Sequence, residues 1–270
     1  MGHSHRRSDT VLAWQNHDRG SPWPFLASPG ELFELDPSHF LFTHFPTEPE
    51  WQLLDAHLTA EEFSQLPDLR GSFFDAGLQL LTPLARLNHA RDTTQFVVQV
   101  PRDMTIDCQL EGPNGEDLER RVFVQRQGDR CLVSATFPYA GPWKVVVFWR
   151  HRDDPGSFSF AGKLDFVASH GTSRRFPRVY TTYHDLDGAL VSPLFTPLEP
   201  GRRQTFKIRL LGADEVHLVT GEKWRRFSSN PTQRNVYELD AEISENEVMK
   251  LVAKTHSGSN NLIVIDFSAE

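Results

Sequence analysis

Most of the chain alternates apolar and polar positions every two residues, which predicts β-strands. Six short runs with this pattern lie in the middle of the chain, and clusters of Gly, Pro, Asn and Asp separate them. The runs are 94–100, 105–112, 120–127, 129–137, 141–151 and 158–169. Turn signals that recur every 8 to 12 residues or so are typical of a β-sandwich.

Individual runs show which faces are expected to be buried. In 131–137, the odd-numbered residues are Cys, Val, Ala and Phe, and the even-numbered ones are Leu, Ser and Thr. Odd and even residues therefore face opposite sides of the sheet. Between two such runs, Asn114–Gly115 is the usual residue pair of a hairpin turn.

The strand pattern stops at "SHGTSRR", residues 169–175, and then resumes to the end of the chain. We interpret 178–185 and 203–212 as strands of this second half. In the latter, Phe206, Ile208 and Leu210 face inward. The fold class predicted is mainly β: two tandem antiparallel sandwiches at 72–168 and 174–270, with no helix of useful length after residue 80.

The first 71 residues follow a different pattern. Residues 1–34 are rich in Ser, Pro, Gly, His and Arg without a sustained period, so we predict a disordered N-terminal tail. Residues 35–71 form a short helical and irregular junction. It contains a helix capped by Asp36 with Pro37 at its first position, and a second helix opened by a Thr59–Glu62 capping box.

Composition narrows the classes of protein. The 270 residues carry a net charge of −8, and basic pairs such as Arg174–Arg175 and Arg202–Arg203 are too short for a surface that follows phosphates, so nucleic acid is not an expected partner. No apolar run approaches the ~20 residues of a membrane helix, and no secretory signal follows the basic N-terminus. The chain has only two cysteines, which favours a reducing cytoplasm.

We found no catalytic, cofactor-binding or metal-binding constellation in the sequence. Cys108 and Cys131 lie inside predicted strands, where they are expected to pack as small apolar residues; a disulfide would be open to them only if their strands are neighbours. The 12 histidines share no metal-ligand spacing, and a structural role is preferred for His39 and His44. His3 and His5 are read as part of a solvated tail rather than a metal-binding tip.

The stretch "HFPTEPEWQLLD", residues 44–55, and the one that follows, "LTAEEFSQLPDLRGSFFDAGLQLL", resemble a known family. They are similar to the end of the transglutaminase-like domain and its continuation in kyphoscoliosis peptidase and hillarin-type proteins. The matching residues are His44, Phe45, Pro46, Trp51, Gln52, Leu53 and Leu54, then Phe63, Leu66, Pro67, Phe73, Phe74, Gly77 and Leu78. The resemblance implies that the two sandwiches are immunoglobulin-like.

The same resemblance implies a catalytic Cys, His and Asp upstream of residue 35. "LAWQNHDRG" at 12–20 has Leu12 where the family has its His, and no Cys precedes it. We therefore expect a non-catalytic interaction or scaffolding module with cytoskeletal protein partners. The alternative is a fragment or isoform of a cysteine peptidase whose active site lies upstream. A third class, sugar binding, has support from Trp143, Trp149 and Trp224, of which at least two are expected in the core.

Trp51, Leu53 and Leu54 are the candidate junction residues. No local helix is long enough to hide them, and burial of one such side chain contributes about 1.5 to 3 kcal/mol. We expect them to pack against the first sandwich as a plug between domains. If instead they face water, they form an exposed apolar patch where a partner binds.

Overall fold

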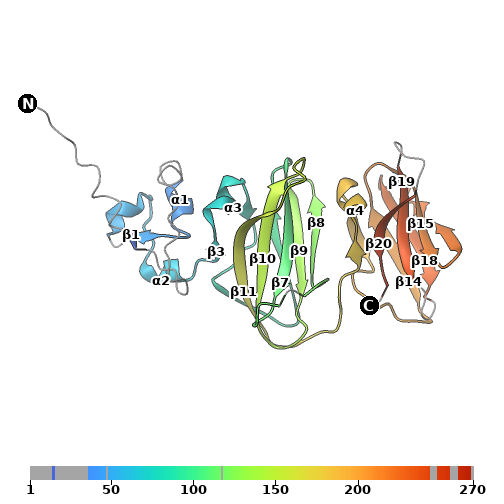
Figure 1. The fold of residues 1–270 in the computed structure, drawn as a ribbon, viewed down its shortest axis with the longest axis horizontal. Coiled ribbons are helices and arrows are strands. Elements are labelled where there is room, and N and C mark those ends of the chain that lie inside the picture. The colour runs from blue at the N-terminus through green and yellow to red at the C-terminus, as the bar shows by residue number, and fades with distance from the viewer. Residues whose placement is uncertain are drawn as a thin grey trace, which may run out of the picture.

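The computed structural model describes residues 14–15, 36–46, 48–116, 118–243, 248–255 and 261–268. Figure 1 shows three parts that follow one another along the long axis: the junction, a first sandwich and a second sandwich. The tail predicted at 1–34 lies outside the described residues, apart from Trp14–Gln15. These two residues form β1, which pairs with β2 (Phe45–Pro46).

The junction contains the short helices that the capping signals predict. Asp36 caps α1 (Pro37–Phe40), and its carboxylate accepts a hydrogen bond from the Ser38 amide at 2.8 Å. A complete capping box between Thr59 and Glu62 opens α2 (Ala60–Ser64). Between them lies the 3₁₀ turn η2 (Pro49–Gln52).

The first sandwich consists of two facing sheets. One has the strand order β3-β11-β10-β7, and β5 pairs parallel to β11 on the same side as β3, farther along the strand. The second has the order β4-β6-β9-β8. Its elements are β3 (Asp68–Leu69), α3 (Gly71–Asp75), β4 (Gln79–Leu80), β5 (Leu87–Ala90), β6 (Thr93–Gln99), β7 (Met104–Glu111), β8 (Val122–Gln127), β9 (Arg130–Thr136), β10 (Gly141–His151) and β11 (Ser159–Ala168). Strand β3 thus begins inside the range assigned to the junction.

The second sandwich repeats this plan, with sheets ordered β12-β20-β19-β15-β16 and β13-β14-β18-β17. Its elements are β12 (Arg178–Val179), α4 (Thr181–Asp185), β13 (Ala189–Ser192), β14 (Arg203–Arg209), β15 (Ala213–Thr220), β16 (Lys223–Arg226), β17 (Ser228–Ser229), β18 (Val236–Glu242), β19 (Met249–Thr255) and β20 (Leu262–Asp266). In both sandwiches a two-residue strand on the edge of one sheet leads through a helical turn, α3 or α4, into the other sheet. The prediction of a mainly β fold built from two antiparallel sandwiches is confirmed.

The predicted strand at 178–185 is wrong beyond Val179, because α4 occupies 181–185. The helical turn places the Tyr183 ring in the core of the second sandwich, where the residue is 1% exposed. Gly188 makes this possible, since a Cβ there would lie 2.5 Å from the ring. In the first sandwich, Phe73 on α3 occupies the corresponding place.

Strand β9 has buried residues on both of its faces. The alternation in 131–137 did not predict this. Cys131 and Val133 face the core, as expected. Thr136 on the opposite face is also fully buried, because Arg121 and the linker after the first sandwich lie over it. The predicted hairpin at Asn114–Gly115 is a turn, but it joins β7 and β8 of different sheets instead of a paired hairpin.

Candidate interaction surfaces

The junction residues do not form the expected plug. Trp51 is 39% exposed and Leu53 is 69% exposed, while Leu54 is half-buried. Their neighbour Gln52 is the buried residue of the 3₁₀ turn. Its side-chain amide donates to the Leu58 carbonyl and accepts from the Leu58 amide, both at 2.7 Å. This double hydrogen bond holds the loop so that Trp51 and Leu53 point outward.

Aromatic side chains of α1 and its C-terminal turn make the contact that was expected of Trp51. The His39 ring stacks on Phe74 of α3 at 4.3 Å between centroids, and Phe42 packs on the same ring at 4.8 Å. Both Phe42 and Phe74 contact the core of the first sandwich. The junction is therefore fixed to the first sandwich through the helical turn α3.

The second sandwich is fixed to the first through the equivalent turn, α4. The Phe123 ring leaves β8 on the outer side and joins the core of the second sandwich, 5.7 Å from Tyr183 and 5.3 Å from Phe176. The Tyr183 hydroxyl donates to Gln125 Oε1 at 3.1 Å and accepts from the Leu190 amide at 3.3 Å. Burial raises the pKa of this hydroxyl, so it stays protonated and able to donate.

Two adjacent arginines fix the linker across the same interface. Arg120 donates to the Phe176 carbonyl at 2.9 Å, to Thr196 Oγ1 at 2.8 Å and to the Ser268 carbonyl at 3.1 Å. Arg121 is buried and donates to the carbonyls of Thr172 and Arg174. Charged donors that each join several backbone carbonyls allow little movement of the linker.

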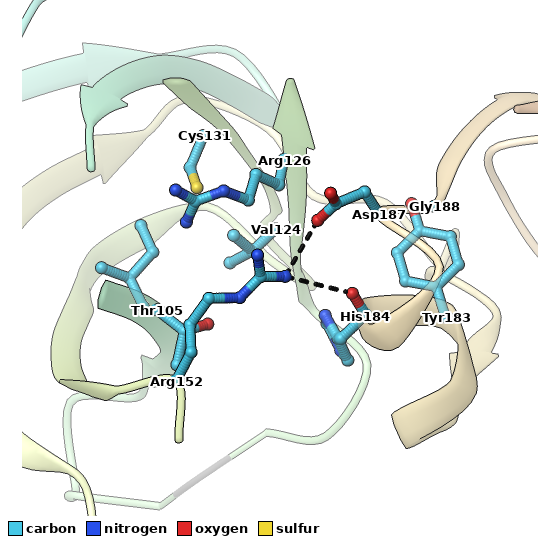
Figure 2. Close-up of a pocket in the computed structure, with 10 residues that line it drawn as sticks. Thr105, Val124, Arg126, Cys131, Arg152, Tyr183, His184, Asp187 and Gly188 are labelled. Carbon is cyan, nitrogen blue, oxygen red and sulfur yellow. Dashed lines mark hydrogen bonds and ion pairs between the residues drawn. The ribbon is translucent and has the colours of Figure 1, made fainter. Parts of the chain in front are cut away.

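A small cavity of about 20 Å³, lined by both polar and apolar side chains, lies beside this interface, with room for no more than one water molecule. Figure 2 shows Arg152 of the loop after β10 reaching Asp187 at 2.9 Å and the His184 carbonyl at 3.3 Å. Burial lowers the pKa of the His184 imidazole and thus favours its neutral form. The cavity is too small for a substrate. The Arg152–Asp187 pair joins the two sandwiches, and Arg126 donates to backbone carbonyls of the first.

Both cysteines are free thiols buried in the core of the first sandwich. They belong to opposite sheets, Cys108 on β7 and Cys131 on β9. Burial raises the pKa of Cys108, and it raises the pKa of Cys131 to about 11. Neither thiol is therefore a ready nucleophile at neutral pH.

The described residues contain no group of three or more His, Cys, Asp or Glu side chains that could hold a metal ion. Among their helices, none is long and apolar enough to span a bilayer. As expected, Trp143 is buried and Trp149 packs against the first core, whereas Trp224 is exposed.

Sequence comparison identifies the first sandwich. The model of the KY-like, immunoglobulin-like domain family matches residues 60–177, which span α2, the first sandwich and the linker. Residues 60–177 of the chain thus form a KY-like, immunoglobulin-like domain.

Two curated relatives agree with this KY-like assignment. Kyphoscoliosis peptidase of Mus musculus is 27% identical over 124 residues, which is 45% of this chain and 18% of the relative. Hillarin of Drosophila melanogaster is 44% identical over 46 residues, which is 17% of this chain and 6% of the relative. The matched stretches thus cover less than a fifth of each relative's length, and they fit a C-terminal part of a KY-like protein, as the resemblance implied.

Among solved structures, a chimeric titin Z1Z2-Z1Z2 tandem functionalized with a GRGDS peptide from fibronectin is similar over 70% of this chain and 96% of the titin chain. It is 12% identical, with a TM-score of 0.22. Sequence reasoning missed the residues that join the sandwiches, above all Tyr183, Gln125 and Arg121. The aromatic-rich stretches "GSFFDAGLQL" and "TTYHDLDGAL" carried a signal for α3 and α4, because each places an aromatic residue third in the turn.

Proposed function

We propose that this chain is a non-catalytic module for protein interaction and scaffolding, with cytoplasmic, cytoskeleton-associated partners. We further propose that it divides into a junction at 35–71 and immunoglobulin-like sandwiches at 72–168 and 174–270. The observation that supports the role most directly is the exposed pair Trp51 and Leu53. Their turn is held outward by the buried Gln52, so the apolar surface is built into the fold.

The chemistry of the described residues also favours a scaffold. The Cys108 and Cys131 thiols are buried with raised pKa values, and the Arg152–Asp187 pair lines a cavity beside the interface that is too small for a substrate. Nucleophilic catalysis needs an accessible nucleophile beside a base. Binding through faces and edges of the sandwiches needs neither.

The proposal is tested with the tagged chain expressed in cultured cells, followed by extraction with a non-ionic detergent. We expect the chain to remain with the cytoskeletal fraction, and a Trp51→Asp/Leu53→Asp variant to move to the soluble fraction. Leu262→Asp is the matched control, because Leu262 is also exposed but lies on the second sandwich. A wild-type chain that is fully extracted would contradict the cytoskeletal role.

A second candidate is the C-terminal part of a cysteine peptidase whose active site lies upstream. The names of the mouse and human relatives favour it. The purified chain is then expected to show no hydrolysis of a fluorogenic peptide and no amine incorporation. A signal that disappears in Cys108→Ala or Cys131→Ala would show instead that catalysis resides in this chain.

A further inference from the structure

Strand β16 lies at the edge of the sheet β12-β20-β19-β15-β16. In the part of the chain that the structure describes, it pairs with β15 alone. The register of this hairpin runs from Thr220 opposite Lys223 to His217 opposite Arg226. The other side of β16 is an open sheet edge, and open edges bind extended peptides because their backbone groups are unpaired.

The main-chain groups of Trp224 and Arg226 point toward this open edge. The Phe227 amide donates to the Val216 carbonyl at 2.9 Å, which marks these two residues as a hydrogen-bonded pair of the ladder. Bonded and non-bonded pairs alternate in an antiparallel ladder. Arg226 and Trp224 are therefore non-bonded toward β15 and direct their N–H and C=O groups outward, two residues apart, as an added strand requires.

The Trp224 side chain supplies an apolar anchor beside these groups. It is 52% exposed, and its ring meets His217 of β15 edge-on, with centroids 5.7 Å apart. This contact restricts one side of the indole and leaves the rest of the ring open. Exposed tryptophans held in this way are frequent centres of binding energy in protein interfaces.

The charge of β16 specifies the partner. Three of its four residues are cationic, in a chain whose net charge is −8. Arg226 pairs with Glu215 at 3.1 Å, whereas no described carboxylate lies within ion-pair distance of Lys223 or Arg225. Pairing of two copies through this edge would bring like charges together and is disfavoured. An acidic strand would meet complementary charge.

In the first sandwich the strand equivalent to β15 is β7, and it forms the edge of its sheet. Leu118 of the following loop donates its amide to the Leu110 carbonyl at 3.0 Å. Farther along, the Cys108 amide donates to the carboxylate of its neighbour Asp107 at 2.9 Å. Among the described residues, β16 is an additional strand beside β15 with no counterpart next to β7, so the open edge at β16 is a property of the second sandwich.

We propose that β16 binds an extended, acidic segment of a partner protein, which adds to the sheet as a strand and packs an apolar side chain on Trp224. The proposal deepens the proposed function and rests on the chain being a protein-interaction module.

The test uses the full chain and a fluorescein-labelled peptide of alternating Glu and Val, about ten residues long to match a long strand. A peptide of alternating Lys and Val is the reference. We expect the Glu peptide to bind at least tenfold more tightly by fluorescence anisotropy. Lys223→Glu/Arg225→Glu should weaken it about tenfold or more through like-charge repulsion. Arg202→Glu, an exposed charge reversal outside β16, should leave it unchanged.

Arg226→Pro tests whether the backbone edge is used. Proline is tolerated on an edge where the missing N–H faces outward, and there it blocks strand addition. We expect it to abolish binding. If this variant does not fold, hydrogen exchange of the Trp224 and Arg226 amides in the wild type decides, since both should slow when the Glu peptide binds.

Four results would overturn the proposal. These are equal binding of the Glu and Lys peptides, full binding by folded Arg226→Pro, unchanged exchange at both amides, and a dimer of the chain that Arg226→Pro disrupts, which would make a second copy the occupant. The proposed function is separable from these outcomes. A chain that is fully extracted from the cytoskeletal fraction yet binds the Glu peptide would fail as a cytoskeletal scaffold only.

Discussion

At the scale of single residues, the exposure of Trp51 decides how much its side chain contributes to the free energy of unfolding. A buried Trp51 would cost about 3 to 5 kcal/mol on truncation to Ala. With 39% of the residue exposed, we expect Trp51→Ala to lower the free energy of unfolding by less than about 1 kcal/mol. Urea melts measure the change. Trp143→Ala, which removes a fully buried indole, is the comparison and should show the larger loss; equal losses would mean that Trp51 is packed in solution.

The buried thiols make stability depend on alkaline pH. The unfolded pKa of a cysteine is about 8.5, and that of Cys131 in the fold is raised to about 11. The stability that this protonated thiol contributes is complete below pH ~8.5 and is lost as the pH rises through the folded value. Cys108 acts in the same direction. We expect the urea midpoint to fall between pH 8 and pH 11.

The control for this pH dependence is Cys108→Ala/Cys131→Ala. Buried tyrosines such as Tyr183 also have raised pKa values, so the test is the difference between the two proteins and not the fall itself. The double variant should lose less stability over this pH range. Identical slopes would show that the thiols do not take part.

At the scale of elements, the attachment of α4 to β8 of the first sandwich depends on the Tyr183 hydroxyl. Tyr183→Phe removes the donor to Gln125 Oε1 and the acceptor of the Leu190 amide. Two buried polar groups are then unsatisfied, and we expect a loss of about 1 to 3 kcal/mol in urea melts. Tyr139→Phe is the control, because its hydroxyl is exposed and makes one long contact, 3.5 Å, with Glu116. A loss no greater than that of the control would contradict the role of Tyr183.

The strands were predictable and the contacts between sandwiches were not. Strand β10 matches its predicted run at both ends, because alternation and flanking turns are local signals. The stretch around Tyr183 repeats the aromatic position of α3, but it does not show that Tyr183 is buried, because that burial depends on Gln125 and Phe123, some 60 residues earlier. Trp51 was expected to be buried because it is hydrophobic. Hydrophobicity does not reveal that its neighbour Gln52 is the buried residue of the 3₁₀ turn.

At the scale of the whole molecule, the interface predicts cooperative unfolding of the two sandwiches. Phe123 belongs to β8 of the first sandwich but packs in the core of the second. We expect a single calorimetric transition for the wild type. Phe123→Asp places a charge in this contact and should separate the transition into two. Leu87→Asp, at an exposed position of the first sandwich, should keep one, and two transitions in the wild type would contradict the coupling.

The arginine contacts across the linker also bear on how far apart two partners would be held. Arg120 joins the first sandwich to Phe176, Thr196 and Ser268 of the second, and α3 joins the junction to the first in the equivalent way. Trp51 lies in the junction and β16 in the second sandwich, and these are the two end parts of the molecule (Figure 1). A tandem without a flexible hinge acts as a spacer of constant length, so ligands that match this span would gain avidity and longer or shorter ones would not.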